Sequence, residues 1–339
     1  MAVVSIAALT ALTTAALRTS GASASMASVT AKCLVASDTQ GLGTHGVARV
    51  PTYCGHLKSG RARGDAVPRI ANQKAAACLI DAGDGLGFAP CELALAQAMV
   101  RAEQHGVGFA GVTRSHHCGA LGILLEAAAV RGMVGLAFSN ASAAIMAWGG
   151  KRPLFGTNPV AAVFPRHAGK PLVIDMSLTQ VTRGQIMLLA NEGKPIPEGW
   201  GMDKDGNPTT DAQKILVGGS LHAVGGLKGT MLALAVELLC CALMGAALSH
   251  EVGSIYVNEG APMNLGQAFL VIDPAALAGR AAYRERIETL IAAMLEDDDV
   301  RLPGQRREAA ARKAAQEGIT IGDELLRELT VLAACNCDV

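Results

Sequence analysis

A glycine-rich stretch near the N-terminus has the spacing of a Rossmann motif but lacks the strand and helix that the motif requires. Gly41-x-Gly43-x-x-Gly46 has the spacing of a dinucleotide-binding turn, which needs a hydrophobic strand before it and a crossover helix after it. Residues 31–37 instead continue a helix-like pattern, and Pro51 follows Gly46 within five residues, so no full helix fits there. The stretch therefore does not predict a Rossmann domain.

The same stretch contains His45 and Arg49, two side chains that suit a small 2-oxo acid. They are four residues apart, so one helical turn would place both on one face with about 5–6 Å between their Cβ atoms. A guanidinium holds a carboxylate through two parallel hydrogen bonds, and an imidazole gives or takes a proton. Thr44 adds a hydroxyl beside them. Taken alone, however, the two residues fit a structural role better than a substrate site. In that role they belong to a capped helix start, with a packed histidine and a surface arginine.

Composition narrows the class of protein. The 339 residues have a formal net charge of zero and no basic run, which argues against a nucleic-acid partner. The apolar run 231–248 contains Glu237, and the apolar residues of 1–26 recur at helical spacing, so we expect neither a membrane span nor a signal peptide. Nine cysteines without a framework of paired spacings, Cys335-x-Cys337 among them, fit a reduced cytoplasmic protein.

Hydrophobic periodicity predicts alternating strands and helices after two N-terminal helices that are separated by a turn at residues 20–21. The predicted strands are 75–80, 107–112, 134–139, 160–164, 172–175 and 269–273. The predicted helices are 90–105, a helix ending near 130, 182–191, 231–248 and 281–295. The order indicates an α/β fold.

Several polar groups lie at turns where a bound anion is expected. A strand, a loop of small residues from Ser115 onward and a helix form a phosphate-binding arrangement. His116, His117 and Cys118 are consecutive and diverge in direction, so we expect no metal site. Arg183 and Lys228 begin helices, and residues 301–307 form a basic turn. For the basic turn alone, a solvated surface is the better interpretation.

Several short blocks occur in the order typical of one family. They are Gly43-Thr44-His45-Gly46-Val47-x-Arg49, Ser115-His116-His117-x-Gly119, Trp148-Gly149-Gly150, Phe155-Gly156-Thr157-Asn158-Pro159, Asp175-Met176, Gly199-Trp200-x-x-Asp203, Gly225-Gly226-x-Lys228-Gly229 and Arg301-x-Pro303-Gly304. Through them the chain resembles the type 2 malate/L-lactate dehydrogenase family, also called the malate/L-sulfolactate dehydrogenase family. That family includes Δ1-piperideine-2-carboxylate reductases.

The resemblance implies a non-Rossmann α/β fold, in which helices flank a mixed sheet and the N-terminal region is helical. It also implies a helical lobe for substrate and dimerisation, residues 1–75 with 260–339, and an NAD(P)-binding domain, residues 76–259. Homodimers or higher homo-oligomers are the rule in the family.

The family's site residues carry over onto named positions of this chain. The acid/base histidine corresponds to His45, or in some relatives to His116, with Thr44 beside it. Arg49 corresponds to the arginine that binds the substrate carboxylate. The implied contacts to NADH or NADPH are His116, His117, Cys118, Gly119, Ala120, Thr157, Asp175, Met176, Ser177, Lys228, Arg301, Gly304, Arg306 and Arg307.

Two departures bear on the substrate, which the resemblance implies is a small anionic molecule. Many relatives have serine where Thr44 stands, and the hydroxyl is retained. Cyclic-imine reductases of the family have His-Gly-Asp where this chain has Arg183-Gly184-Gln185. The resemblance implies an NAD(P)H-dependent oxidoreductase that interconverts a small 2-oxo acid and a 2-hydroxy acid of malate, sulfolactate or lactate type. An arginine at position 183 suggests a contact with a second anionic group, which malate and sulfolactate have and lactate lacks. The alternatives are a cyclic imino acid reductase, for Δ1-piperideine-2-carboxylate or Δ1-pyrroline-2-carboxylate, and a non-catalytic nucleotide-binding protein.

Overall fold

The computed structural model describes residues 1–334, and the Cys335-x-Cys337 pair lies outside that range. Its α-helices are α1 (Ile6–Thr19), α2 (Ala24–Thr39), α3 (Val50–Ser59), α4 (Phe88–His105), α5 (Leu121–Val130), α6 (Arg183–Asn191), α7 (Ala212–Leu216), α8 (Leu227–Glu237), α9 (Arg280–Met294), α10 (Gln305–Glu317) and α11 (Asp323–Ala334). Within residues 1–334, none of the helices combines the length and apolar character needed to cross a bilayer.

A seven-stranded mixed sheet forms the centre of the molecule, with the strand order β2-β3-β4-β12-β5-β8-β9. The strands are β2 (Arg69–Lys74), β3 (Ala77–Asp81), β4 (Val107–Ser115), β5 (Val134–Ser139), β8 (Val160–Phe164), β9 (Leu172–Met176) and β12 (Leu265–Ile272). β3 and β4 are parallel, and the other neighbours are antiparallel. The predicted mixed sheet flanked by helices is confirmed.

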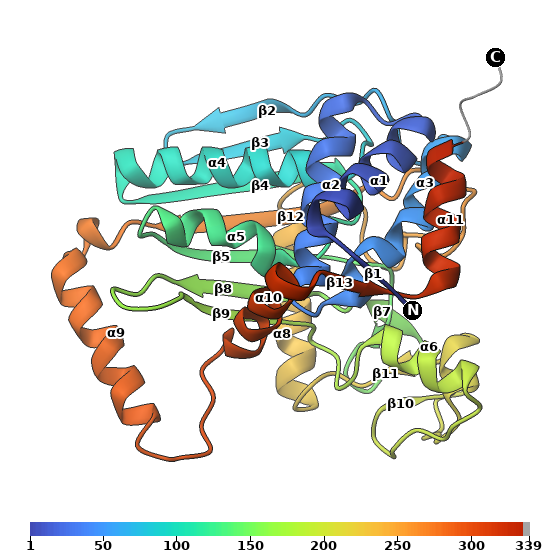
Figure 1. Cartoon of the computed structure of the whole chain (residues 1–339). Coiled ribbons are helices and arrows are strands. Elements are labelled where there is room, and N and C mark those ends of the chain that lie inside the picture. The colour runs from blue at the N-terminus through green and yellow to red at the C-terminus, as the bar shows by residue number, and fades with distance from the viewer. Residues whose placement is uncertain (335–339) are drawn as a thin grey trace.

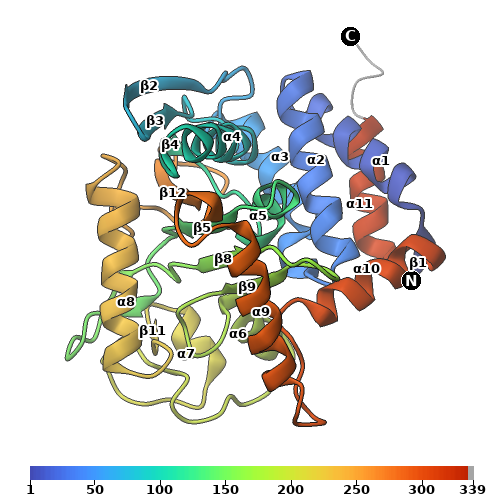
Figure 2. The same cartoon turned by 90° about the vertical axis from the view of Figure 1, so that its left-hand side faces the viewer.

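Helices cover both faces of this sheet. α4 and α5 pack on one face, while α8 and the π-helical turn Leu238–Ala242 that continues it pack on the other (Figure 2). α1, α2, α3 and α11 gather beside the sheet, at the right of Figure 1. A short strand at the N-terminus, β1 (Ala2–Val4), pairs with β13 (Ile319–Ile321) next to this group. The predicted helical N-terminal region is therefore present.

A smaller four-stranded sheet has the strand order β10-β11-β6-β7. Its strands are β10 (Gly201–Met202), β11 (Ser220–Leu221), β6 (Ile145–Met146) and β7 (Pro153–Phe155). α6 and α7 pack on it around Ile186 and Ile215.

The predicted division into residues 1–75 with 260–339 and residues 76–259 stays a prediction. β2 and β12, which both lie within the first of these segments, are strands of the large sheet.

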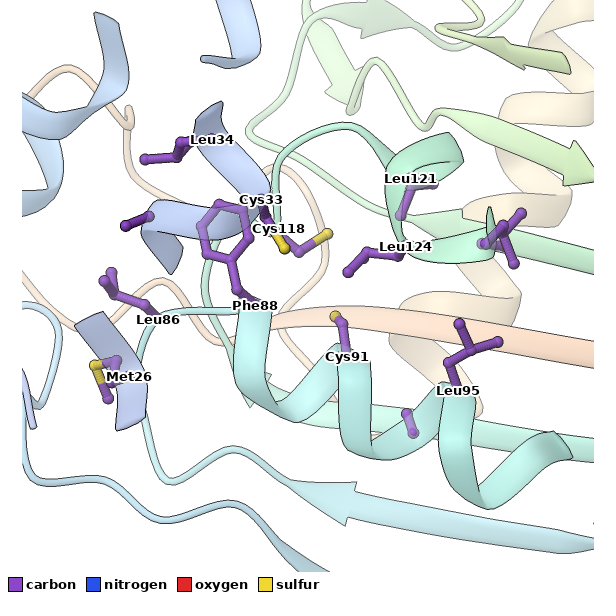
Figure 3. Close-up of a cluster of buried hydrophobic side chains, with 14 of the residues drawn as sticks. Met26, Cys33, Leu34, Leu86, Phe88, Cys91, Leu95, Cys118, Leu121 and Leu124 are labelled. Atoms are coloured by element: carbon purple, nitrogen blue, oxygen red, sulfur yellow. The ribbon is translucent and has the colours of Figure 1, made fainter. Parts of the chain in front are cut away.

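The main hydrophobic core joins α2, α4 and α5 and supports the loop before α5. Figure 3 shows Cys33 of α2, Phe88 of α4 and Cys118 of that loop packed together, with Leu121 and Leu124 beside them. A Cβ added to Gly119, whose φ is +75°, would lie 2.8 Å from a ring carbon of Phe88. The core therefore fixes the path of the loop 116–120, and Gly119 permits its close approach to Phe88.

The predicted helix 231–248 differs from the observed one. α8 begins at Leu227, and regular α-helix ends at Glu237. The Glu237 carboxylate is buried and accepts hydrogen bonds from Asn158 Nδ2 (2.8 Å), the Ser249 backbone N–H (2.6 Å) and the Ser249 hydroxyl (2.7 Å). A buried acidic group that is satisfied in this way belongs to a folded interior, and it accounts for a charge inside an apolar run.

Candidate active site

The stretch with His45 and Arg49 follows α2 as two short 3₁₀ turns, Gly43–His45 and Val47–Arg49. Gly46 separates them with an extended backbone (φ −94°, ψ −153°), so the predicted single helical turn through both residues is wrong. The cause is Asp38, whose Oδ2 accepts the Val47 N–H at 2.7 Å. A Cβ at Gly46 would lie 2.0 Å from Asp38 Oδ1, so glycine is the residue that fits there.

Thr44 connects the two side chains. Its hydroxyl lies 3.0 Å from His45 Nδ1, and its carbonyl oxygen accepts the Arg49 Nε–H at 2.8 Å. The Arg49 guanidinium carbon also lies 5.3 Å from the centroid of the Tyr256 ring, in a cation–π contact. The Nε–H of Arg49 is hydrogen-bonded to Thr44, and Tyr256 covers one face of the guanidinium. The two terminal nitrogens of Arg49 are therefore left for a ligand.

His117 is the ring that stacks on His45. Their centroids are 5.7 Å apart and the planes are inclined by 28°. His117 Nδ1 lies 2.6 Å from the hydroxyl of Tyr53 in α3, and the Gly119 N–H donates to the same nitrogen at 3.3 Å. The loop before α5 is thereby joined to the loop after α2.

His116 lies deeper and is 1% exposed. Its Nε2 is 2.7 Å from His56 Nδ1, and its Nδ1 is a buried atom without a hydrogen-bond partner in residues 1–334. His56 Nε2 is 3.0 Å from the Val257 carbonyl oxygen, and the Arg61 guanidinium donates to that oxygen and, at 2.7 Å, to the Ser254 carbonyl. This buried pair anchors the segment that carries Tyr256.

Asp175, at the end of β9, forms a second polar centre. Its Oδ2 accepts the Gly122 N–H at the N-terminus of α5 (3.0 Å) and pairs with Arg307 Nη1 of α10 (3.3 Å). A Cβ at Gly122 would collide with both groups, at 2.9 and 2.7 Å. Asp175 and Arg307 also lie close enough to His45 to act on its titration. Asp175, Arg307 and His45, predicted from distant parts of the sequence, are thus neighbours.

The first turn of α6 lies against Thr44, because a Cβ at Gly184 would be 3.5 Å from Thr44 Cγ2. Arg183, the preceding residue, is half-buried and forms no ion pair within residues 1–334. Its position next to the loop after α2 was not evident from sequence spacing.

The other predicted contacts are more dispersed. Lys228, Arg301 and Arg306 are exposed and make no ion pair in the described part of the chain. Cys118 and Ala120 are buried, Met176 is exposed, and the Ser177 hydroxyl bonds that of Thr179 at 3.0 Å. The Thr157 carbonyl accepts the Leu178 N–H at 2.8 Å, and Gly304 (φ +96°) leads into α10.

Burial and neighbouring positive charge hold the histidines of this site neutral. Burial, reinforced by Arg49, lowers the pKa of His45 to about 4. Burial and His56 lower the pKa of His116 to about 3. The pKa of His117 lies well below its usual range for the same reason, and that of His56 is also lowered. Burial raises the pKa of Asp38 to about 6.

These shifts predict a pH dependence of stability. Unfolded histidines protonate near pH 6.5, whereas the four in this site have lowered pKa values in the native state, so unfolding takes up protons. The free energy of unfolding should therefore fall as the pH is lowered from about 6.5 to about 4. Asp38 opposes this trend, because its raised pKa favours the native state at low pH. The four histidines together should outweigh this single carboxyl group. Urea unfolding at a series of pH values measures the slope, and a native state that gains stability across this range would contradict the assignment.

Sequence reasoning did not identify Asp38, Tyr53, His56, Arg61 or Tyr256 as part of this site. Tyr53 and His56 are fully buried in a short helix, where they are indistinguishable from core residues until the loop before α5 packs on them. The available signal was chemical, since a buried imidazole and a buried hydroxyl need hydrogen-bond partners.

Comparison with known proteins gives a consistent result. The family model described as malate/L-lactate dehydrogenase matches residues 4–330. A (2R)-3-sulfolactate dehydrogenase (NADP(+)) from Chromohalobacter salexigens is 40% identical over 322 residues, which is 95% of each chain. A Delta(1)-pyrroline-2-carboxylate/Delta(1)-piperideine-2-carboxylate reductase from Pseudomonas aeruginosa is 37% identical over 306 residues, 89% of this chain and 90% of the relative.

A solved structure agrees with these matches. The delta1-piperideine-2-carboxylate reductase from Pseudomonas syringae pvar. tomato superposes with a TM-score of 0.92 and 33% identity, over 98% of this chain and 100% of the other. The similarity therefore spans the helical region, both sheets and the loops around His45.

Proposed function

The chain belongs to the malate/L-lactate dehydrogenase family, and from this premise we propose that it is an NAD(P)-dependent oxidoreductase that interconverts a small 2-oxo acid and the corresponding 2-hydroxy acid. A reduced nicotinamide, when bound, supplies the hydride that reaches C2 of the substrate. The residues of the chain bind the acid, orient it and handle the proton.

The observation that carries this proposal is the arrangement around Thr44. One backbone carbonyl orients the guanidinium of Arg49, and the hydroxyl of the same residue bonds the imidazole of His45. Arg49 binds the substrate carboxylate through its free terminal edge. The oxygen on the adjacent carbon then lies beside Thr44 and His45, where a proton is needed.

His45, rather than His116, is the proposed acid/base. His45 is half-buried and its Nε2 has no hydrogen-bond partner in residues 1–334, whereas His116 is closed off from solvent. Neutral His45 is in the right state to accept the proton of a 2-hydroxy acid. A carboxylate on Arg49 offsets the positive charge that lowers the pKa of His45, and so favours the imidazolium needed in the reductive direction.

The residues near Asp175 fit a nicotinamide dinucleotide. Asp175 Oδ1 makes no hydrogen bond within residues 1–334, so it is free to accept from ribose hydroxyls while Oδ2 stays on Gly122 and Arg307. Arg301, Arg306 and Lys228 are exposed cations of the kind that pairs with phosphates. The proposed cofactor contacts are residues 116–120, Thr157, residues 175–177, Lys228, Arg301, Gly304, Arg306 and Arg307.

A substrate screen tests the proposal. The absorbance of NADH and of NADPH is followed with oxaloacetate, 3-sulfopyruvate, pyruvate and the two cyclic imino acids. Oxidation of either cofactor with a 2-oxo acid supports the proposal. Oxidation with cyclic imines alone would replace it with the imine reductase activity named for several relatives. Cofactor binding without any oxidation would favour a non-catalytic nucleotide-binding protein.

Arg183 is the proposed contact for a second anionic group of the substrate. It is half-buried, stands at the start of α6 and adjoins Thr44 through Gly184. An Arg183→Gln variant should lose about 10-fold or more in kcat/KM with oxaloacetate or 3-sulfopyruvate, the loss expected for a charged hydrogen bond. It should keep its kcat/KM with pyruvate, which lacks that group. An equal loss with all three substrates would remove Arg183 from substrate selection.

Two further properties belong to the same proposal. α8 and the turn after it expose the apolar side chains of Leu227, Met231, Leu232, Leu238 and Leu243. An exposed apolar surface of this kind supports a homodimer.

The seven cysteines within residues 1–334 are all free and buried, which supports a reducing, cytoplasmic location.

A further inference from the structure

A segment without helix or strand, residues 254–261, precedes β12, and we call it the Tyr256 segment. Its backbone carbonyls accept hydrogen bonds from side chains of α3. His56 Nε2 lies 3.0 Å from the Val257 carbonyl oxygen, and the Ser59 hydroxyl donates to the Asn258 carbonyl oxygen at 2.6 Å. The segment is therefore attached to one helix that is far from it in the sequence.

Arg61, two residues beyond the end of α3, adds further attachments. Its side chain is buried, at 3% exposed, and forms no ion pair within residues 1–334. Its guanidinium donates instead to the carbonyl oxygens of Ser254 (2.7 Å), Val257 and Ala261 (3.3 Å). A buried charge is costly to leave without hydrogen bonds, so Arg61 holds these carbonyls in place.

α3 also carries the arginine of the proposed substrate site. Arg49 is the N-cap residue of this helix. Further along the helix, a Cβ at Gly55 would lie 2.3 Å from Asn258 Oδ1, so glycine allows the Asn258 side chain to pack closely there. The same helix therefore bears Arg49 and fixes the backbone on either side of Tyr256.

This attachment determines where the Tyr256 ring lies. The centroid of the ring is 5.3 Å from the guanidinium carbon of Arg49. The ring is 39% exposed, and its hydroxyl makes no hydrogen bond within residues 1–334. The face of the ring, rather than the hydroxyl, is therefore the part of Tyr256 that acts on Arg49.

Two contacts together fix the Arg49 side chain before a ligand arrives. The Thr44 carbonyl accepts the Nε–H at 2.8 Å, and Tyr256 covers one face of the guanidinium. An arginine side chain loses much rotamer entropy when it is ordered. A guanidinium that is already ordered binds an anion at a lower entropic cost, and the negative face of an aromatic ring stabilises its charge.

We propose that Tyr256 is a positioning residue that sets the affinity for the substrate carboxylate: the face of its ring holds the Arg49 guanidinium so that both terminal nitrogens meet the carboxylate. Arg61 maintains this arrangement by holding the Tyr256 segment on α3. The proposal rests on the proposed function, in which Arg49 binds the carboxylate. Because neither Tyr256 nor Arg61 transfers the hydride or the proton, their effect is on substrate binding rather than on turnover.

The test compares Tyr256→Phe and Tyr256→Leu with the wild-type enzyme, by oxamate binding in the presence of cofactor and by kinetics with the best substrate of the screen. Leucine is apolar but has no aromatic face. The Leu variant should raise the Kd of oxamate and the KM by about 5- to 30-fold, the range of a cation–π contact shielded from water. The Phe variant keeps the face, so both constants should stay within about threefold of wild type. In both variants kcat and the Kd of the cofactor should change by less than about twofold.

Tyr283→Leu is the matched control for loss of an aromatic ring. Tyr283 belongs to α9, and its hydroxyl donates to the Pro165 carbonyl oxygen at 3.1 Å. Because this ring does not contact Arg49, the control should leave the Kd of oxamate unchanged.

Arg61→Gln tests the attachment of the segment. Glutamine is uncharged and too short to reach the three carbonyls, so the ring should leave Arg49 and the Kd of oxamate should rise as in Tyr256→Leu. The double variant should bind oxamate no more weakly than the weaker single variant, because both substitutions remove the same contact. If Arg61→Gln does not fold, the Tyr256 variants still decide the question.

NMR of protein labelled with nitrogen-15 arginine gives a readout that does not depend on activity. The Arg49 Nε–H signal, assigned by its absence in Arg49→Lys, should be shifted by the ring current of Tyr256. It should move in Tyr256→Leu and in Arg61→Gln, and it should stay in place in Tyr256→Phe.

Several results would overturn the proposal. They are a wild-type Kd of oxamate in Tyr256→Leu, an equal loss in the Phe and Leu variants, a loss confined to kcat or to cofactor affinity, and an Arg49 signal that does not respond to Tyr256→Leu. A wild-type protein without oxidoreductase activity would instead defeat the proposed function. The Arg49 signal would then still show whether the ring holds the guanidinium.

Discussion

Replacing His45 with alanine is expected to lower kcat by a factor of about 10² to 10⁴, the usual contribution of a general acid or base. The imidazole is half-buried, neutral and hydrogen-bonded to the Thr44 hydroxyl. The affinity for the cofactor should change much less than kcat. Steady-state kinetics in both directions, together with the Kd of the cofactor, measure the two effects separately.

A matched control for this variant is His105→Ala. His105 is an exposed histidine at the C-terminal end of α4, and Figure 1 shows α4 running along the sheet away from α2. Its removal should leave kcat at the wild-type value. If His45→Ala has the same kcat as this control, His45 has no part in proton transfer.

Replacing Arg49 with lysine should lower kcat/KM for the 2-oxo acid by about 10- to 100-fold, which corresponds to about 1.5–3 kcal/mol for a hydrogen bond to a charged group. Lysine keeps the charge but loses the planar fork that binds both carboxylate oxygens. It also loses the Nε–H that bonds the Thr44 carbonyl and the flat face that packs on Tyr256. Inhibition by oxamate, a carboxylate of similar shape, should weaken in parallel.

The exposed pair of Arg63 with Asp65 provides the comparison for this substitution. Arg63→Lys should leave both kcat/KM and oxamate inhibition unchanged, because exposed ion pairs contribute little. Wild-type kinetics in Arg49→Lys would show that the carboxylate binds elsewhere.

Most of the secondary structure could be predicted because it depends on local periodicity. The strands 134–139 and 160–164 were predicted to the residue, since an apolar run bounded by turn residues is read directly from the chain. The sheet order could not be predicted. β12 lies between β4 and β5 although more than a hundred residues separate it from either, and such pairing depends on packing between distant segments.

The site was predictable in its residue types and less so in its geometry. His45 and Arg49 stand out because an imidazole and a guanidinium four residues apart suit an acid substrate. The break at Gly46 depends on Asp38, whose carboxylate fills the space a side chain would need. Local spacing predicts a regular turn and carries no information about a carboxylate folded back from the end of α2.

The different positions of the adjacent residues His116 and His117 were beyond sequence reasoning for a similar reason. Adjacent histidines are equivalent in the sequence, yet one is buried against His56 and the other stacks on His45. His117 Nδ1 contacts Tyr53 and Gly119, two residues that are far apart in the sequence.

The most direct measurement is a crystal structure of the protein with oxidised cofactor and oxamate. We expect the oxamate carboxylate to be bound by the terminal nitrogens of Arg49, with its C2 oxygen within hydrogen-bond distance of Thr44 or His45. An oxamate bound away from Arg49, or an imidazole of His45 turned away from it, would contradict the account.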